Sequence, residues 1–283
     1  MAKPSVSNVR VKKYSGKSQE ENDDLLAVEE PLEIRLTFGS KGDRTQKSIS
    51  VTMRTPGNDF ELALGFLFTE GIIRGREDVL QIRYCEKEEA KDNFENIVSV
   101  SLQENVEPSI LKLERHFYTS SSCGVCGKAS IEAVDTIADR SSSQKNSAFR
   151  ISSSEINALP KVVREQQIVF GHTGGLHASA LFNTAGEIVF LREDIGRHNA
   201  VDKVIGAAFQ KGILPADSSL LFLSGRSSFE LIQKAVMAGI PCVAAVGAPS
   251  SLAVALAKEF NVTLIGFLRD DRFNVYSGED RIT

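Results

Sequence analysis

The sequence has no tryptophan, only four cysteines and only four histidines among its 283 residues, and its charges nearly cancel. With 33 Lys and Arg against 37 Asp and Glu, the formal charge is -4, so the chain has no overall positive field to hold a polyanion such as nucleic acid. Four cysteines are too few for the disulfide framework of a small secreted scaffold. Hydrophobic residues at 42% and charged residues at 25% exclude disordered, collagen-like and coiled-coil chains. The length predicts one large or two modest domains.

We expect no signal peptide, because the residues up to Lys13 are polar and basic with no apolar run. We therefore expect a cytoplasmic protein. One stretch, 235–257, carries no charged residue and is long enough to cross a bilayer. Glycines and prolines in its middle would interrupt a spanning helix, so we predict a buried strand between two helices and no membrane insertion.

The first half of the chain predicts a polar extension followed by a small α+β domain. Residues 1–28 show no sustained periodicity and are expected to form a flexible extension with at most an early strand. The domain is expected over 29–139 and to end with a cysteine-containing loop and a helix. Alternating and helical apolar patterns predict its elements in this order: a hairpin of strands 32–38 and 48–53, a helix over 60–67, and strands 80–84 and 97–102.

The second half predicts an α/β domain over 155–283, separated from the first by a Ser-rich linker at 140–154. Alternating strands and helices indicate right-handed crossovers and a largely parallel sheet covered on both faces. The predicted elements are a hairpin of strands 178–182 and 187–191, a helix over 201–208, strand 219–223, a helix over 229–236, strand 242–246, a helix over 252–260 and strand 262–267.

Cys123 and Cys126 are the most specific chemical signal, because two thiols lie two residues apart in a Gly/Ser loop that precedes a predicted helix. Backbone N–H groups there and nearby Lys128 favour the thiolate, the nucleophile of disulfide and persulfide exchange. Three other interpretations stay open: a zinc site completed by His172 and His177, a thioredoxin-like redox pair, and two inert cysteines. Elemental analysis of the purified protein tests the zinc site.

The segment 192–203 gathers charged groups between a predicted strand and a predicted helix, a location that favours phosphate. Arg197 and Lys203 are suited to anionic oxygens, and a carboxylate such as Asp194 or Asp202 is suited to a guanine edge or a ribose. Local ion pairs at an ordinary helix start explain the same composition.

Two further loops have the small residues that a ligand can approach closely, 171–177 and 224–228. The second follows a predicted strand, and 247–251 repeats the same strand, loop and helix order; in open α/β sheets such loops form the ligand crevice. Structural histidines in a turn and ordinary capped helix starts are the alternatives. Neither 224–228 nor 247–251 has the Gly-Lys-Ser/Thr of a Walker A motif, so a nucleotide would be bound rather than hydrolysed.

Several of these segments, in the same order along the chain, resemble the FdhD family of sulfur carrier proteins required for formate dehydrogenase activity. The resemblance extends over about residues 30–270 and rests on segments 53–57, 61–71, 121–128, 173–178, 194–203 and 224–226. It implies an α/β protein of two domains, with a cytidine-deaminase-like three-layer α/β/α domain at the C-terminus and a smaller α+β domain at the N-terminus.

The resemblance also implies a function. The protein would be a sulfurtransferase that takes persulfide sulfur from a cysteine desulfurase and passes it to the molybdenum cofactor, in its bis-guanine-dinucleotide form, of formate dehydrogenase. Cys123 and Cys126 would relay the sulfur, and a homodimer without a tightly bound metal would be expected. Twelve residues would bind the guanine nucleotide portion: Thr173, His177, Asp194, Gly196, Arg197, His198, Asn199, Asp202, Lys203, Ser224, Gly225 and Arg226.

Two other functions compete with this one. A non-enzymatic chaperone would hold the guanine dinucleotide cofactor without handling sulfur. A zinc-dependent nucleoside deaminase would share the implied fold, but its motifs are incomplete here, because His177-Ala178-Ser179 lacks the general-base Glu and Pro241–Ala245 lacks the second cysteine.

Overall fold

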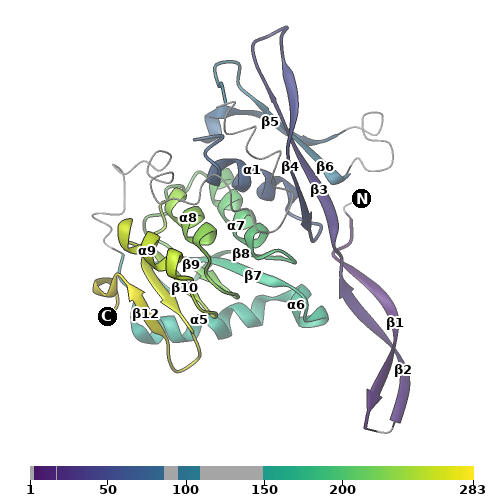
Figure 1. Ribbon diagram of the computed structural model, residues 1–283, viewed down its shortest axis with the longest axis vertical. Helices are drawn as coiled ribbons and strands as arrows, with labels where there is room; N and C mark the ends of the chain where they lie inside the picture. Colours follow the sequence, from purple (N-terminus) through teal and green to yellow (C-terminus); the bar gives the residue numbers. More distant parts are fainter. Residues whose placement is uncertain (1–2, 17, 86–94, 109–148) are drawn as a thin grey trace.

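The computed structural model describes residues 3–16, 18–85, 95–108 and 149–283. These residues form two sheets with their helices and one separate β-hairpin (Figure 1). In the part of the chain that is described, no helix combines the length and the apolar composition needed to cross a membrane.

The N-terminal sheet has four strands in the order β4-β3-β6-β5, with β3 parallel to β6 and the other two pairs antiparallel. Leu32, Ile34 and Leu36 alternate with more exposed residues along β3, so one face of the sheet is buried. Helix α1 covers that face. The elements are β3 (Glu30–Phe38), β4 (Thr45–Arg54), α1 (Asp59–Thr69), the 3-10 turn η1 (Arg76–Asp78), β5 (Val79–Tyr84) and β6 (Ile97–Leu102), which confirms the predicted strands and helix.

The C-terminal sheet has six strands in the order β12-β11-β10-β9-β7-β8. Only β9, β10 and β11 are parallel to one another, whereas β7, β8 and β12 each run antiparallel to their neighbours. The prediction of a largely parallel sheet is therefore wrong at both edges of the sheet. The β7-β8 hairpin forms one edge and the short strand β12 forms the other, and both pair antiparallel. The strands are β7 (His177–Phe182), β8 (Ile188–Asp194), β9 (Leu220–Leu223), β10 (Cys242–Ala245), β11 (Thr263–Gly266) and β12 (Asn274–Ser277).

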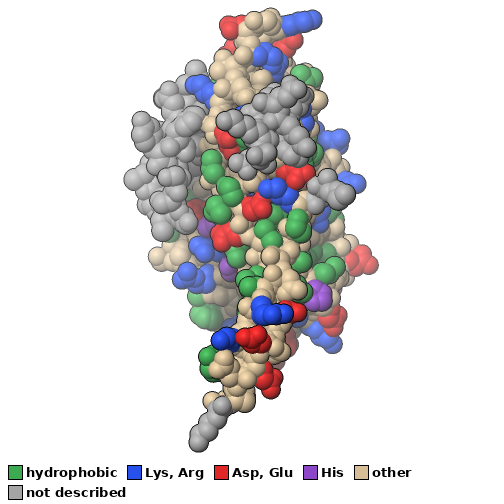
Figure 2. All heavy atoms as spheres, turned by 90° about the vertical axis from the view of Figure 1, so that its right-hand side faces the viewer, with side chains coloured by type: hydrophobic (Ala, Val, Ile, Leu, Met, Phe, Trp, Pro, Cys, Tyr) green, Lys and Arg blue, Asp and Glu red, His purple; other side chains and the backbone are tan. Residues whose placement is uncertain are grey.

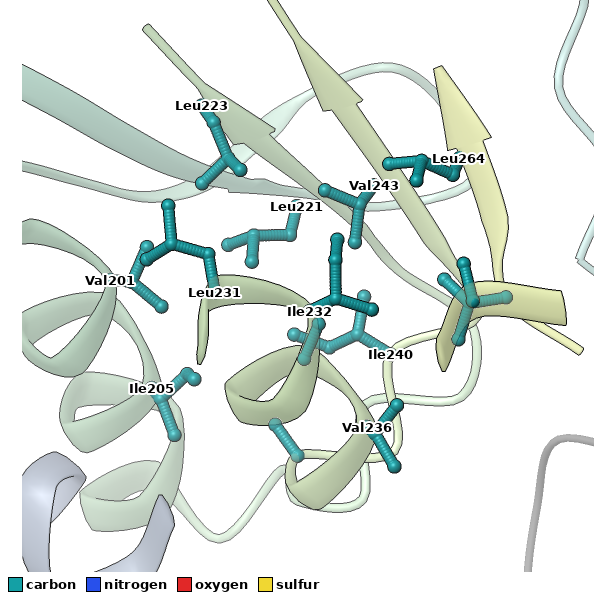
Figure 3. Close-up of a cluster of buried hydrophobic side chains, with 14 of the residues drawn as sticks. Val201, Ile205, Leu221, Leu223, Leu231, Ile232, Val236, Ile240, Val243 and Leu264 are labelled. Atoms are coloured by element: carbon teal, nitrogen blue, oxygen red, sulfur yellow. The ribbon is translucent and has the colours of Figure 1, made fainter. Parts of the chain in front are cut away.

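Helices cover both faces of this sheet. Helices α7 (Arg197–Lys211), α8 (Phe229–Met237) and α9 (Ser251–Glu259) lie on one face, where Ile205, Ile232 and Leu264 are fully buried. Figure 3 shows apolar side chains of α7 and α8 pointing toward those of the central strands. Helix α5 (Ser153–Gln166) covers the other face and is followed by α6 (Ile168–Thr173). The three layers agree with the predicted α/β/α domain.

Helix α5 was not predicted, and it begins inside the expected linker. Ser152 and Glu155 form a capping box, in which the Ser152 side chain accepts the Glu155 N–H and the Glu155 carboxylate accepts the Ser152 N–H. Phe149 is buried, and Ile151 bridges to Ile282 near the C-terminal 3-10 turn η4 (Glu279–Arg281). The last part of the predicted 140–154 linker therefore belongs to the C-terminal domain, and residues up to 148 lie outside the described part.

The two domains meet where α1 crosses α7 (Figure 1). A Cβ atom at Gly65 would lie 1.9 Å from the backbone oxygen of Asp202, and one at Gly206 would lie 1.8 Å from that of Glu61. Only glycine permits this backbone approach. Leu62 and Leu67 of α1 and Phe209 of α7 share one buried cluster with the N-terminal sheet, so the two domains are packed against each other.

The extension expected over 1–28 is instead a regular antiparallel hairpin of β1 (Val6–Ser15) and β2 (Ser18–Ala27). It points away from both domains (Figure 1), and its base lies near α6. Opposite charges face each other across the strands, as in Arg10 with Asp23, and Figure 2 shows basic and acidic side chains side by side near its end. The sequence expectation is corrected here, because cross-strand pairing forms without a buried apolar face.

Candidate functional site

The two cysteines of the predicted relay, Cys123 and Cys126, lie outside the described residues. The other two cysteines, Cys85 and Cys242, are both buried. Burial raises the pKa of the Cys242 thiol to about 12, so it is not a source of thiolate near neutral pH.

Three of the predicted nucleotide-binding residues lie instead in the contact between the two domains. The Lys203 ammonium is 2.7 Å from Asp194 Oδ2 and donates to the backbone oxygen of Thr55 at 2.9 Å. The other carboxylate oxygen of Asp194 accepts hydrogen bonds from the Asn199 side chain and from the Gly196 backbone. All three side chains, of Asp194, Asn199 and Lys203, are at least nine-tenths buried.

This cluster fixes the end of β4 against the start of α7. Asn199 Nδ2 donates to the Met53 oxygen at 2.8 Å, and Thr52 Oγ1 donates to Asn199 Oδ1 at 3.1 Å. The Thr55 N–H in turn donates to Asp194 Oδ2. The buried polar groups of the two domains thus form hydrogen bonds with each other. Buried polar groups in folded proteins are nearly always hydrogen-bonded in this way.

Asp202 has a similar position on the next turn of α7. Both of its carboxylate oxygens accept hydrogen bonds from Lys234 of α8 at 2.9 Å, and one also accepts a bond from Thr69 of α1. Nearby negative charges, of Asp202 first and then of Glu70, raise the pKa of Lys234 against the opposing effect of burial. Asp202 therefore connects three helices, and its side chain points into the protein.

The partly buried members of the same motif form a cluster with the histidine that begins β7. His198 Nε2 lies 2.9 Å from Glu230 Oε2 in the first turn of α8. A Cβ atom at Gly225 would lie 3.3 Å from the ring of His177, so the loop after β9 passes directly against that imidazole. Arg197, whose Nε atom is buried without a partner among the described residues, lies at the start of α7.

Charges within this cluster set its protonation. The pKa of His177 is lowered, first by partial burial and then by the positive charges of Arg197 and His198. The pKa of Glu230 is lowered chiefly by its hydrogen bond with His198. Near neutral pH, His177 is therefore a neutral imidazole close to the Arg197 guanidinium, whereas Glu230, which is bonded to His198, is an ionised carboxylate.

The side chains of two other predicted residues already form hydrogen bonds within the protein. The Thr173 hydroxyl donates to Val169 inside α6, and the Ser224 hydroxyl accepts the Ala178 N–H. Arg226 is exposed in the loop after β9. The structure thus brings together His177, Arg197, His198 and Gly225, with Asp194 opposite His177 across β7 and β8. The side chains of Asp202 and Lys203 are instead buried in the domain contact.

The loops after the three parallel strands pack side by side at one edge of the sheet. The Gly247 N–H donates to the Gly225 oxygen at 2.9 Å, and the Phe267 N–H donates to the Gly247 oxygen at 3.1 Å. In open α/β sheets this carboxyl edge is where ligands bind.

A crevice of about 580 Å³ opens between these loops and α5. We call it the arginine crevice, because Arg164 of α5 and Arg269 and Arg272 of the loop after β11 line it. Asp270 and Asp271 lie in the same loop, and Ser224 and Val246 contribute the floor at the ends of β9 and β10. Its size suits a nucleoside phosphate, and guanidinium groups are the usual partners of phosphate.

The arginine crevice was missed by sequence reasoning, although a signal for it exists. The segment 267–272 follows β11 as 224–228 follows β9, so a third loop at the same edge follows from the strand order. Arg164 had no such signal, because it reaches the crevice from α5, which was not predicted.

A second hollow of about 610 Å³ lies beside β8, α6 and the loop before α1. It differs from the arginine crevice in charge, because each of its three cations is paired with a carboxylate. The pairs are Lys3 with Glu30, Arg192 with Glu61 and Lys203 with Asp194. An anionic ligand is therefore better served by the arginine crevice.

Among the described residues, no group of three or more His, Cys, Asp or Glu side chains is placed to hold a metal ion. The zinc site considered from the sequence includes Cys123 and Cys126 and so falls partly outside them.

The fold and the site together define a two-domain α/β protein with a basic crevice at the carboxyl edge of an open sheet. Comparison with known proteins gives the particular family: residues 27–283 match the model of the FdhD/NarQ family, and the chain belongs to that family. A crystal structure from Desulfotalea psychrophila, provisionally assigned as a formate dehydrogenase accessory protein, has the same fold, with a TM-score of 0.72 and 24% identity over 99% of this chain and 100% of its own.

Relatives of known name cover nearly the whole chain. "Sulfur carrier protein FdhD" of Mycolicibacterium paratuberculosis is 52% identical over 92% of both chains. The proteins of the same name from Streptomyces coelicolor and Sulfurisphaera tokodaii are 51% and 40% identical, over 92% and 98% of this chain and 89% and 99% of their own.

Proposed function

We propose that this protein is a sulfurtransferase that carries sulfur as a cysteine persulfide and delivers it to a molybdenum cofactor of the bis-guanine-dinucleotide form. The observation that carries the proposal is the 52% identity, over 92% of both chains, to a protein named as a sulfur carrier. The Cys123-x-x-Cys126 pair supplies the thiols that such a carrier needs.

The proposed chemistry is exchange between sulfur atoms. A thiolate at Cys123 attacks the outer sulfur of a donor persulfide, R–S–SH; a new S–S bond forms, the donor's S–S bond breaks, and the donor leaves as a thiolate. Cys126 then receives, stabilises or resolves the new persulfide. No external oxidant or reductant is consumed, because one persulfide replaces another.

The guanine nucleotide portion of the cofactor is proposed to bind at the carboxyl edge of the C-terminal sheet. The arginine crevice supports this placement, since Arg164, Arg269 and Arg272 converge on a space of about 580 Å³. The less buried members of the predicted set lie on the same loops and adjoining helix starts and stay candidates for cofactor contact; they are His177, Arg197, His198, Gly225 and Arg226. Asp194, Asn199, Asp202 and Lys203 position these loops through the domain contact.

Incubation with a cysteine desulfurase and cysteine, followed by mass spectrometry of the intact protein, tests the relay. A gain of about 32 Da on the segment that contains Cys123 and Cys126 is expected. The Cys123→Ala/Cys126→Ala variant should gain no mass and transfer no sulfur. Cys85→Ala is the matched control, because Cys85 is buried and should not change the result. Full transfer by the double variant would refute the relay.

The second candidate function is a cofactor chaperone that binds the guanine dinucleotide without carrying sulfur. The arginine crevice is the one observation that favours this chaperone function. A chaperone should bind the nucleotide and gain no mass after incubation with the desulfurase. A cysteine desulfurase as donor, formate dehydrogenase as acceptor, a homodimer and a cytoplasmic location remain predictions that follow from the family.

A further inference from the structure

The arginine crevice contains acidic as well as basic groups. Asp270 and Asp271 line it together with the three arginines, and both aspartates are exposed. Within the described residues, no ion pair joins either aspartate to an arginine. Both signs of charge therefore remain available to a ligand, which is unusual for carboxylates and guanidinium groups that share one crevice.

The local backbone holds the two aspartates at the tip of a closed turn. The Arg269 N–H donates to the Arg272 oxygen at 2.8 Å, and the Arg269 guanidinium donates to the oxygens of Val246 and Leu268. The loop is thereby tied to the end of β10. A turn fixed in this way presents Asp270 and Asp271 in a defined place rather than on a mobile tip.

The two carboxylates that the sequence suggested for a guanine edge are not available to a base. Asp194 and Asp202 are buried and bonded to Lys203 and Lys234. Among the described residues that line the crevice, Asp270 and Asp271 are the only carboxylates.

Of the two common purine bases, a carboxylate favours guanine. Guanine presents N1–H and the 2-amino group as two adjacent donors, which match the two oxygens of one carboxylate. Adenine presents the acceptor N1 beside its amino group, so a carboxylate in the same place faces a lone pair.

We infer that the Asp270–Asp271 pair reads the Watson–Crick edge of a guanine base, while Arg164, Arg269 and Arg272 bind the phosphates of the same nucleotide. The inference rests on the proposed function, because it assumes that the arginine crevice holds the nucleotide portion of the cofactor. It adds the residues that decide which base is accepted.

Xanthosine diphosphate tests whether an aspartate contacts the base, because a variant that is merely misfolded would not gain affinity for this nucleotide. Xanthine has an oxygen at position 2 where guanine has an amino group, so an Asn side chain, with one acceptor and one donor, matches xanthine as an Asp side chain matches guanine. The full-length protein and its Asp270→Asn and Asp271→Asn variants are titrated calorimetrically with GDP, ADP and xanthosine diphosphate.

Wild-type protein should bind GDP at least about tenfold more tightly than the other two nucleotides, the effect of one charge-assisted hydrogen-bond pair. One of the two Asn variants should lose about tenfold in affinity for GDP and gain a similar factor for xanthosine diphosphate. Asp43→Asn, at an exposed aspartate in the loop between β3 and β4, is the matched control and should leave all three affinities unchanged.

The outcomes separate this inference from the proposed function. If GDP binds but neither Asn variant gains affinity for xanthosine diphosphate, the readout by Asp270 and Asp271 is wrong while nucleotide binding stands. Equal binding of GDP and ADP by the wild type leads to the same conclusion. If GDP does not bind at all, the nucleotide part of the proposed function fails along with the inference, and the desulfurase experiment alone decides the sulfur relay.

Discussion

The Lys203 ammonium lies 2.7 Å from the Asp194 carboxylate, and both side chains are almost completely buried where the two domains meet. Lys203 also donates to Thr55 of the N-terminal domain, and Asp194 accepts the Thr55 N–H. One ion pair thus connects the end of β8, the start of α7 and the loop that precedes α1. The segment that resembles a nucleotide-binding motif in the sequence joins the two domains.

Removing one member of this pair should destabilise the protein strongly. Asp194→Asn leaves a buried ammonium without a counter-charge, and Lys203→Met leaves a buried carboxylate without one; each should lower the free energy of unfolding by about 3–5 kcal/mol. The double variant should cost less than the sum of the two, because no charge is left unpaired. Urea denaturation measures all three.

The control for this prediction is the partly exposed pair of Arg35 with Glu33 on the N-terminal sheet, whose side chains are 24% and 23% exposed. Glu33→Gln should change the free energy of unfolding by no more than about 1 kcal/mol, because solvent screens an ion pair at the surface. Equal effects of Glu33→Gln and Asp194→Asn would contradict the structural role given to the buried pair.

The crossing of α1 and α7 should tolerate no side chain at Gly65. A methyl group there would lie 1.9 Å from the backbone oxygen of Asp202, so the helices must separate. Gly65→Ala should cost at least about 1–3 kcal/mol, the usual penalty of an overpacked contact. Gly171→Ala in α6 is the control, because no atom lies within 4 Å of the added methyl group. Thermal unfolding should show a clear drop in Tm for the first variant only.

Burial and then the positive charge of Arg197 hold the pKa of His177 below its ordinary value of 6.5. Arg197→Gln removes a positive charge, so the pKa of His177 should rise, as NMR titration of its ring signals can show. In the wild type, the unfolded state takes up the proton first as the pH falls, so this group's contribution to stability is lost from about pH 6.5 downward. Arg74→Gln, far from the cluster in sequence and exposed, should leave the titration unchanged. An unchanged pKa of His177 in Arg197→Gln would show that the Arg197 charge does not contribute to lowering it.

Arg272 should contribute directly to the affinity for nucleotide phosphates. Arg272→Gln removes a charged donor from the arginine crevice and should weaken GDP binding by about tenfold or more. Binding should also weaken as salt is raised, and less steeply in the variant. Arg76→Gln, in η1 of the N-terminal domain, serves as the control in the same calorimetric titration. Unchanged affinity in Arg272→Gln would place the phosphates elsewhere.

Much of the architecture could be predicted from periodicity alone. Strand β6 matches its predicted range of 97–102, and α8 and α9 agree with theirs to within a residue or so, since buried apolar faces repeat every two or every 3.6 residues. The hairpin β1-β2, by contrast, has hardly any buried apolar face and left no such pattern. Helix α5 begins within the predicted Ser-rich linker, where Ser152 and Glu155 have the spacing of a capping box.

The sequence by itself determined the two domains, the loops at strand ends and the thiol pair, because these depend on local composition and spacing. Only the tertiary structure decided the roles of the charged residues. Asp194 and Asp270 are both acidic residues at or just after strand ends, yet one is sealed against Lys203 and the other lines an open crevice. Burial and partners arise from segments far apart in the chain, here β4 with α7 and α5 with the loop after β11, so no local pattern encodes them.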